Sequence, residues 1–546
     1  MKPQIKWAIE ACGAALLVSL PYFSPLLYPS RIALYHHHLH LGKLIAGILL
    51  AILGVALLVF ALIAYIHYRF NSRARAAVGA ALAGIVLLRV MDSLVLIVNE
   101  WQSSPYSENR GAPRADLFAN HLGWFLAHHD LRLAIPFALA GIALWRPRIT
   151  SLLVRVTRIG LAAFACCLLW IAPQLTYFAF RLRPVPPFDR STAQASAPTP
   201  KRIVWVLFDE LSYNLVFDHP PQGMDFPNLR SLRAQSVSFG NLDPVGFATD
   251  RIIPSLLTGH EIEAIRSTSN GQLLYRDSGD KALHSLNPND TLFGLANANG
   301  WSPGVDGWYN PDCRILYPVL TSCWWLPGAM ARLPAEVMGA SEDKSAIANA
   351  FQLIPVFLFS PKPSNSEMIG PRGDLLAEQM SHADTLIRDG QIRFVFLHLS
   401  VPHPPGFYDR NTHKICACGN YLDNLVLADD TLAALEHEID STPWKDQTTL
   451  IVSSDHSWRV PLWRGWFGWT PEEETLSGGR FDQRPVFLVH FPGQTSQSDV
   501  PAPTPEMTEH DIIAAMLENK LNSPQDLLAF VHAQQAPSRQ TAPAPH

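Results

Sequence analysis

Long apolar stretches fill the first third of the chain, whereas the rest alternates short apolar runs with polar segments. A helix needs about 20 apolar residues to cross the roughly 30 Å hydrocarbon core of a bilayer. We therefore predict an α-helical membrane domain with five transmembrane helices over residues 1–180. The five stretches lie near 7–28, 43–67, 76–98, 131–146 and 157–180.

Basic residues beside the spans predict their orientation, because such clusters mark the cytoplasmic side of a membrane. Lys2 and Lys6 precede the first span. Arginines crowd the links after the second and fourth spans, namely Arg69, Arg73, Arg75, Arg146, Arg148, Arg155 and Arg158. The N-terminus is therefore expected in the cytoplasm, and an odd number of spans places the chain from residue 181 onward on the opposite side.

The composition changes after the last span. Residues 181–200 are rich in Pro, Ala, Ser and Thr, which is typical of a linker. A folded domain is expected over 201–533. The tail 534–546, rich in Gln, Ala and Pro, is expected to be disordered.

Within 201–533 the apolar runs are short and lack the alternation of a strand with one wet face, so they predict strands buried on both faces. These runs occupy 203–208, 394–397, 450–452 and 486–489. Helical periodicity lies between them, most clearly at Leu422, Leu425, Leu432 and Leu435. Strands that alternate with helices predict an α/β domain with a central, largely parallel sheet.

Charge and cysteine content narrow the possibilities further. The formal net charge of −5 gives no support for nucleic-acid binding. Outside the cytoplasm thiols tend to pair, so the four cysteines of the polar part are disulfide candidates in any of three pairings. A second metal site is the alternative, although C-x-C lacks the spacing that zinc sites favour. The four are Cys313, Cys323, Cys416 and Cys418.

Polar residues follow three of the predicted strands, where the carboxyl ends of parallel strands meet at one edge of a sheet. Buried acids repel each other and lose hydration, so a cation is expected between them. Mixed carboxylate and imidazole ligands predict one divalent metal ion, with Zn²⁺ ahead of Mn²⁺ or Mg²⁺. The residues are Asp209 and Glu210 after the first strand, His398 and His403 with the second, and Asp455 and His456 after the third.

A hydroxyl group completes this constellation. The segment from Phe247 to Gly259 predicts a loop that enters a helix, with Pro254 in its first turn. The hydroxyl of Thr249 could act as a nucleophile there, and helix amides together with Arg251 could hold an anionic substrate. The alternative for Thr249 is an ordinary helix cap.

In this order, the motifs resemble those of the alkaline phosphatase and sulfatase superfamily over roughly 201–520. They are Phe208-Asp209-Glu210, the segment Thr249–Gly259, Pro402-His403-Pro404-Pro405 and Ser454-Asp455-His456. With five preceding spans, the chain is most similar to the membrane phosphoethanolamine transferases and the lipoteichoic acid synthases. The stretch Asn420–Asn424 after two cysteines is also similar to the phosphoethanolamine enzymes.

The resemblance implies a role for each position. His403 would contact the transferred group or protonate the leaving oxygen, and Thr249 would be the nucleophile. The implied substrate-binding residues are Arg251, His398 and His403, and the implied metal ligands are Asp209, Glu210, Thr249, Asp455 and His456.

Threonine cannot become the formylglycine of sulfatases, so Thr249 favours a transferase. The resemblance implies an enzyme of a bacterial inner membrane, with its catalytic domain periplasmic or extracellular. It would move phosphoethanolamine or phosphoglycerol from a phospholipid donor onto an envelope glycan or lipid, as in lipopolysaccharide modification. Two alternatives stay open: a membrane-anchored phosphodiesterase or sulfatase-like hydrolase, and a non-catalytic envelope assembly protein.

Overall fold

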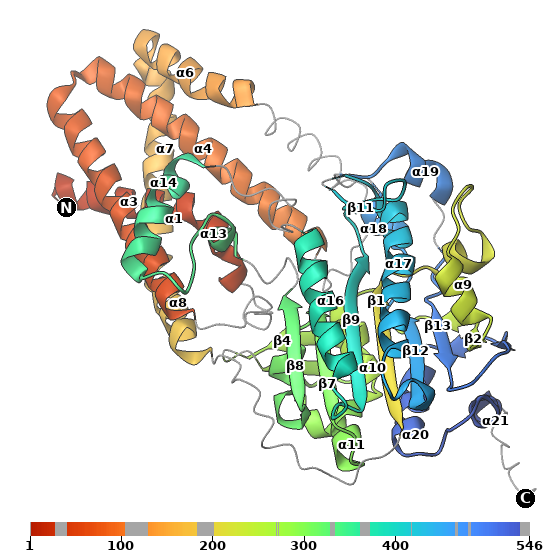
Figure 1. Ribbon diagram of the computed structural model, residues 1–546. Helices are drawn as coiled ribbons and strands as arrows, with labels where there is room; N and C mark the ends of the chain where they lie inside the picture. The colour runs from red at the N-terminus through yellow and green to blue at the C-terminus, as the bar shows by residue number, and fades with distance from the viewer. Residues whose placement is uncertain are drawn as a thin grey trace, which may run out of the picture. The chain divides into compact units, whose positions relative to one another are not determined.

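The computed structural model divides the chain into two compact units, each described by itself below (Figure 1). Unit 1 comprises Met1–Pro184, Ser269–Gly271 and Met330–Met368, and unit 2 comprises the rest. The structure describes residues 2–27, 41–103, 129–182, 201–268, 270, 272–327, 333–360, 372–416, 418–464, 468–478 and 482–535. Most of the predicted linker 181–200 and of the predicted tail 534–546 lies outside these residues.

Unit 1 is built from apolar helices. Its N-terminal part contains α1 (Pro3–Ser19), α3 (Gly42–Arg69), α4 (Ser72–Ser103), α6 (His129–Trp145), α7 (Pro147–Ala165) and α8 (Leu168–Arg181). Two further helices come from the middle of the chain, α13 (Pro334–Val337) and α14 (Ala346–Phe359). The segment Met330–Met368 thus belongs by its contacts to unit 1, although it falls inside the predicted domain 201–533.

Several helices of unit 1 have the length and composition of membrane spans, which suggests a membrane anchor. Among the described residues four qualify, and the span predicted near 131–146 is the shorter apolar helix Ala134–Trp145. The helix that contains it, α6, has Pro136 in its interior. The four longer candidates are Pro3–Tyr22, Gly42–Arg69, Ser72–Met91 and Thr150–Arg181.

Unit 2 is organised around an eight-stranded sheet of order β14-β2-β13-β12-β1-β9-β7-β8. Only the pairs that involve β13, with β12 and with β2, run antiparallel within this sheet as described. The predicted α/β domain with a largely parallel sheet is therefore confirmed. The strands are β1 (Arg202–Asp209), β2 (Val237–Phe239), β7 (Pro303–Tyr309), β8 (Ser322–Pro327), β9 (Phe394–Pro402), β12 (Thr448–Ser454), β13 (Phe487–His490) and β14 (Ser498–Val500).

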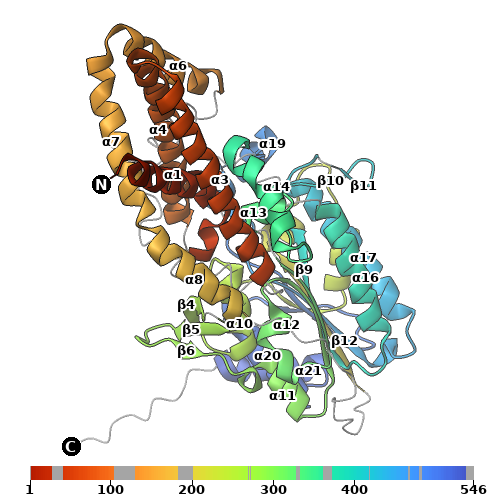
Figure 2. The same cartoon turned by 90° about the vertical axis from the view of Figure 1, so that its left-hand side faces the viewer.

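The central strand β1 explains why its sequence shows no alternation. Val204, Val206 and Phe208 pack on one face of the sheet, against the core beneath α9, α16 and α17. The residues between them pack on the opposite face, beneath α10, α11 and α20. Helices lie on both sides of the sheet (Figures 1 and 2), and every residue of β1 is buried. These helices are α9 (Pro227–Arg233), α10 (Thr249–Thr258), α11 (Leu292–Ala298), α16 (Arg372–Arg388), α17 (Tyr421–Asp440) and α20 (Thr508–Leu517).

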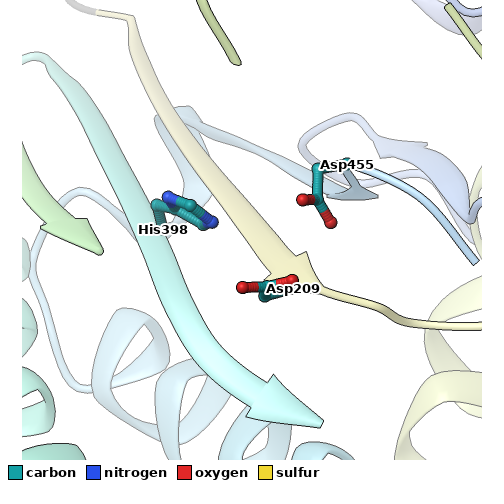
Figure 3. A group of neighbouring side chains, drawn as sticks. All are labelled: Asp209, His398 and Asp455. Carbon is teal, nitrogen blue, oxygen red and sulfur yellow. The ribbon is translucent and has the colours of Figure 1, made fainter. Parts of the chain in front are cut away.

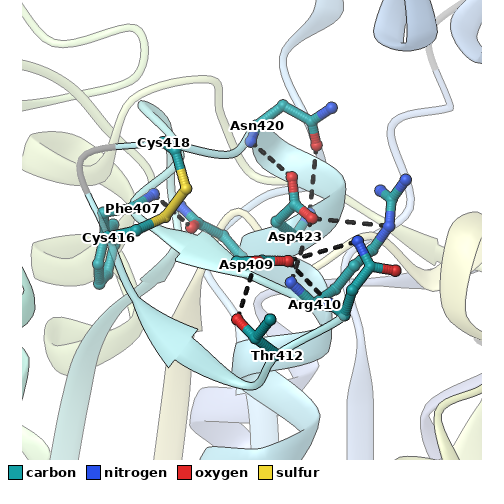
Figure 4. The surroundings of a disulfide bond; sticks show 10 residues. Phe407, Asp409, Arg410, Thr412, Cys416, Cys418, Asn420 and Asp423 are labelled. Carbon is teal, nitrogen blue, oxygen red and sulfur yellow. Dashed lines mark hydrogen bonds and ion pairs between the residues drawn. A yellow bond between two sulfur atoms is a disulfide. The ribbon is translucent and has the colours of Figure 1, made fainter.

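The four cysteines predicted to pair form two disulfides, Cys313–Cys323 and Cys416–Cys418. Figure 4 shows the second beside the start of α17. There the Asn420 side chain caps the helix, and the Asp423 carboxylate accepts a hydrogen bond from the Asn420 N–H at 2.8 Å. The bridge thus closes the loop that leads into α17.

Candidate active site

Three neighbouring parallel strands, β12, β1 and β9, bring together three side chains of types that can ligate a metal. Asp209 is the last residue of β1, His398 lies opposite Leu207 on β9, and Asp455 follows β12. One ligand atom from each side chain lies within 4.8 Å of the others, and all three side chains are buried (Figure 3). Asp209 and Asp455 lie at the predicted edge of the sheet. His398, expected at a strand end and as a substrate-binding residue, lies inside β9, because that strand continues to Pro402.

The cluster suits a divalent cation. Asp209 Oδ2 accepts a hydrogen bond from Trp308 Nε1 at 2.7 Å, whereas Oδ1 accepts none from the residues that the structure describes. Oδ1 lies 3.7 Å from His456 Nε2. A buried carboxylate oxygen without a hydrogen bond is costly, and a second carboxylate, Asp455, adds repulsion. Two carboxylates and an imidazole are ligands that zinc and manganese accept. Asp209, His398 and Asp455 could therefore hold such an ion, and its identity is not fixed by the donor set.

The electrostatics of the three side chains point the same way. Burial, with the charge of Asp455, raises the pKa of Asp209 to about 7. Burial lowers the pKa of His398 to about 4, so its imidazole is neutral and keeps a lone pair for ligation. Burial also acts to raise the pKa of Asp455, but His456 outweighs it and the net shift is downward. The site thus presents one firm negative charge and one carboxyl that a cation would deprotonate.

Thr249 lies beside this cluster as the first residue of α10, because the helix cap is Ala248. Its hydroxyl donates a hydrogen bond to Asp455 Oδ2 at 2.7 Å and lies 3.3 Å from His456 Nε2. The ordinary cap role for Thr249 is therefore wrong. The predicted position of Pro254 in the first turn is also wrong, because α10 begins at Thr249 and Pro254 lies in its interior.

Glu210 is held in a different way from Asp209. Its backbone has φ of 75°, a left-handed conformation that is uncommon outside glycine. Its N–H donates to Asp455 Oδ1 at 3.1 Å, and its carbonyl accepts from the Tyr421 hydroxyl at 2.6 Å. These contacts hold the Glu210 backbone in this conformation.

The Glu210 carboxylate is surrounded by donors. It forms an ion pair with Arg459, and Trp463 Nε1 lies 2.8 Å and 2.9 Å from its two oxygens. His456 Nδ1 is 3.9 Å from Oε1. The protein itself therefore neutralises this charge, and the ligand roles of Glu210 and His456 stay predictions.

His403 lies at the end of β9 and is held from several directions. Its Nδ1 lies 2.5 Å from the Pro404 carbonyl, which can only accept, so the proton is on Nδ1 and Nε2 keeps a free lone pair. Burial, with the charge of Arg372, lowers the pKa of His403 well below its usual range. Its ring meets the Trp463 ring edge-on, with centroids 5.1 Å apart. His403 is therefore a neutral imidazole with one nitrogen available.

Arg372 fixes the segment that carries His403. Its guanidinium donates to the carbonyls of Ser400 at 2.9 Å, His403 at 2.9 Å and Pro404 at 2.6 Å. Asn424 belongs to the stretch Asn420–Asn424 noted in the sequence. Its side-chain amide also donates to the His403 carbonyl, at 3.2 Å. This stretch therefore braces both the His403 segment and, through its tyrosine, Glu210.

Arg251 contacts a different part of unit 2. Its guanidinium donates to the Glu263 carbonyl at 3.2 Å, on β4 (Ile262–Ser267). Its predicted role in substrate binding stays a prediction.

Four residues of the site were not predicted from sequence: Trp308, Arg372, Arg459 and Trp463. Arg459 follows Ser454-Asp455-His456 within three residues, so its place beside the motif was a usable signal. Trp308 and Arg372 come from a strand and a helix with no motif of their own, and only the sheet order brings them here.

No protein-family model matches the chain, and no curated protein matches it. Among solved structures, a protein in the alkaline phosphatase superfamily from Vibrio parahaemolyticus is 15% identical, with a TM-score of 0.34, over 60% of this chain and 72% of that one. The lipoteichoic acid synthase LtaP from Listeria monocytogenes is 13% identical, with a TM-score of 0.34, over 60% and 76%. A phosphonate monoester hydrolase of Agrobacterium radiobacter is 14% identical, with a TM-score of 0.36, over 58% and 74%. At these values the similarities assign no activity or substrate to this chain.

Proposed function

We propose that this protein is a membrane-anchored, metal-dependent transferase. It moves the phosphorylated headgroup of a phospholipid, phosphoethanolamine or phosphoglycerol, through Thr249 onto an envelope glycan or lipid. One observation carries the proposal: the Thr249 hydroxyl, free of any capping role, donates to Asp455 at 2.7 Å beside the cluster of Asp209 and His398. The apolar helices of unit 1 support a substrate that resides in the membrane.

In the first half-reaction, Thr249 Oγ attacks the phosphorus of the donor. The Oγ–P bond forms, and the P–O bond to diacylglycerol breaks, and the leaving oxygen takes a proton from water. The Oγ proton moves to His456 Nε2, which lies 3.3 Å from Oγ and 3.0 Å from Asp455 Oδ2. A divalent ion held by Asp209, His398 and Asp455 would supply positive charge that lowers the pKa of the hydroxyl and stabilises the phosphoryl oxygens.

In the second half-reaction, an acceptor alcohol attacks the same phosphorus. Its proton moves to Nε2 of His403, whose Nδ1–H is already used by the Pro404 carbonyl, and passes from there to the hydroxide that the first half-reaction left. The Oγ–P bond breaks, and Thr249 recovers its proton from the Asp455–His456 pair. Arg459 contributes positive charge in the site while it remains paired with Glu210.

The test is a turnover assay with the full chain in vesicles of defined lipids. Phosphatidylethanolamine and phosphatidylglycerol are offered separately, each diluted in phosphatidylcholine, and the diacylglycerol released is measured. We expect release from one of the first two lipids and a loss of at least about 10³-fold in Thr249→Ala. The matched control is Thr475→Ala, a change at an exposed helical threonine, which should leave the rate unchanged.

The products separate the alternatives. A headgroup recovered on an added alcohol supports a transferase, whereas headgroup released only into water supports the hydrolase. Equal diacylglycerol release by the Thr249→Ala variant and the unmodified protein would contradict both.

A further inference from the structure

The segment Met330–Met368 leaves unit 2 after β8 and returns to it before α16, and its contacts place it in unit 1. Both views show α14 beside α3 (Figures 1 and 2). A part of unit 1 is thus inserted in the sequence of unit 2, between β8, which contains Cys323, and α16, which begins at Arg372. The structure of this insertion indicates what surrounds it.

Two glycines of α3 let α14 approach closely. A Cβ on Gly47 would lie 2.4 Å from the Cβ of Asn349, and a Cβ on Gly54 would lie 2.7 Å from Cδ1 of Ile354. Small residues at such contacts are typical of helix pairs in membranes. Because both contacts advance along the two helices together, α14 runs in the same direction as α3, beside its N-terminal half.

Polar contacts fasten both ends of α14 within unit 1. The Glu342 carboxylate, just before α14, accepts from the backbone N–H groups of Lys43 and Leu44, each at 2.9 Å. It thereby caps the N-terminus of α3, where donors lack partners and negative charge is favourable. After the last turn, the Ser360 carbonyl accepts from the Tyr22 hydroxyl at 2.8 Å. The insertion is thus docked specifically on unit 1.

The side of α14 that is turned away from α3 is largely apolar, with Gln352 as a polar exception, and the residues that the structure describes leave it exposed. Its inner residues include Ala350, Leu353 and Phe357, which are buried in the core shared with α3 and α8. On the outer face the exposed fractions are 63% for Ile347, 74% for Phe351 and 80% for Phe359. Large uncovered apolar surfaces on a protein mark contact with another apolar partner.

The neighbouring surface of α3 indicates which partner this is. α3 has the composition of a membrane span, and its leucines Leu50, Leu53 and Leu57 are exposed by 42%, 55% and 60%. Since α14 lies alongside this helix, the two apolar surfaces are at the same depth. The occupant that fits both is the acyl-chain region of a lipid bilayer.

We propose that α14 is a membrane-embedded helix whose residues Ile347, Phe351 and Phe359 contact lipid acyl chains. Its 14 residues extend about 21 Å, less than the roughly 30 Å of the hydrocarbon core. It is therefore too short to cross the bilayer, and the sequence of unit 2 is interrupted by a segment that lies in the membrane. This inference does not depend on the reaction that the protein catalyses.

Spin labels on the full chain in phosphatidylethanolamine–phosphatidylglycerol vesicles test the proposal. The free cysteines Cys12, Cys166 and Cys167 are first replaced by serine, and the two disulfides are kept. Single labels are then introduced by Ile347→Cys or Phe351→Cys. Two reference labels are Leu57→Cys on α3 and Leu283→Cys, a 40% exposed leucine of unit 2.

Oxygen concentrates among acyl chains, whereas a nickel chelate stays in water, so their collision rates with each label distinguish the surroundings. We expect the labels at 347 and 351 to collide with oxygen in preference to nickel, as the label at 57 does. Preference for nickel, as expected at 283, would overturn the proposal. Low collision rates with both reagents would also overturn it, because protein rather than lipid would then cover the face. The two positions guard against a local misfold at either one.

Discussion

The buried ion pair between Glu210 and Arg459 gives a quantitative test of the site. Glu210 is fully buried, Arg459 is 7% exposed, and Trp463 donates to both carboxylate oxygens. The perturbation is a double-mutant cycle of Glu210→Gln, Arg459→Gln and the double variant. Glutamine removes the charge of either side chain; it matches glutamate in size and is smaller than arginine.

The burial of this ion pair determines how much unfolding free energy each single variant should lose. Removing one partner of a buried pair leaves the other charge uncompensated, which costs about 3–5 kcal/mol of unfolding free energy. Removing both leaves neither charge buried alone, so the double variant should lose much less than the sum of the single losses. We expect a coupling of at least about 2 kcal/mol. Arg464 and Glu474 form an exposed pair and serve as the matched control, with no measurable coupling expected.

Pulse proteolysis of the full chain in detergent, over a urea series, measures the unfolding free energy of each variant. The control pair Arg464→Gln and Glu474→Gln is measured in the same way. Additive losses at Glu210 and Arg459 would refute the reasoning, because the two charges would then not share one buried environment. A loss at Glu210→Gln that appears only when metal is present would instead favour the ligand role predicted from sequence.

Three further predictions concern other parts of unit 2. Asp209→Asn should lower the amount of metal bound per chain, measured by elemental analysis, whereas Asp225→Asn, at an exposed aspartate, should not. Unchanged metal content in Asp209→Asn would contradict the proposed ligands. Arg372→Lys loses the fork that holds three carbonyls around His403, so kcat for diacylglycerol release should fall about 10²-fold with KM nearly unchanged, and an unaltered kcat would exclude this positioning role. Burial raises the pKa of Asp312 well above its usual range, so the folded chain keeps a proton that the unfolded chain loses near pH 4. The unfolding free energy of the protein should then fall by up to about 1.4 kcal/mol per pH unit above about pH 4. Asp312→Asn should therefore raise the urea concentration at the unfolding midpoint at pH about 7.5 but not at about 4.5. Equal increases at both pH values would contradict the raised pKa of Asp312.

Much of the fold could be predicted from the sequence, because it depends on local patterns of apolar residues. The run 203–208 is apolar on both faces, and β1 does lie between two buried layers. The cysteines of the polar part were expected to pair, and they do. The start of α10 was harder to predict. Proline is usually found in the first turn of a helix, but Pro254 lies in the interior of this one.

The details of the site were less predictable because they depend on distant residues. Glu210 and Arg459 are 249 residues apart, and no local pattern indicates that an arginine reaches that carboxylate. The roles of Asp209 and Glu210 depend on a backbone turn at Glu210, where φ is positive in a residue that rarely adopts it. Sequence could therefore place the acids at one edge of the sheet, but not assign their partners.

The central claim is that Thr249 carries the transferred group, and the most direct test is intact-mass analysis of the full chain after incubation with a defined phospholipid. His403→Ala is used to slow release, because that variant lacks the proposed base for the second half-reaction. We predict a mass increase equal to the headgroup phosphoryl unit, mapped to the peptide with Thr249 and absent in Thr249→Ala. Conversion of the lipid without any adduct on that peptide, or an adduct that persists in Thr249→Ala, would contradict the account.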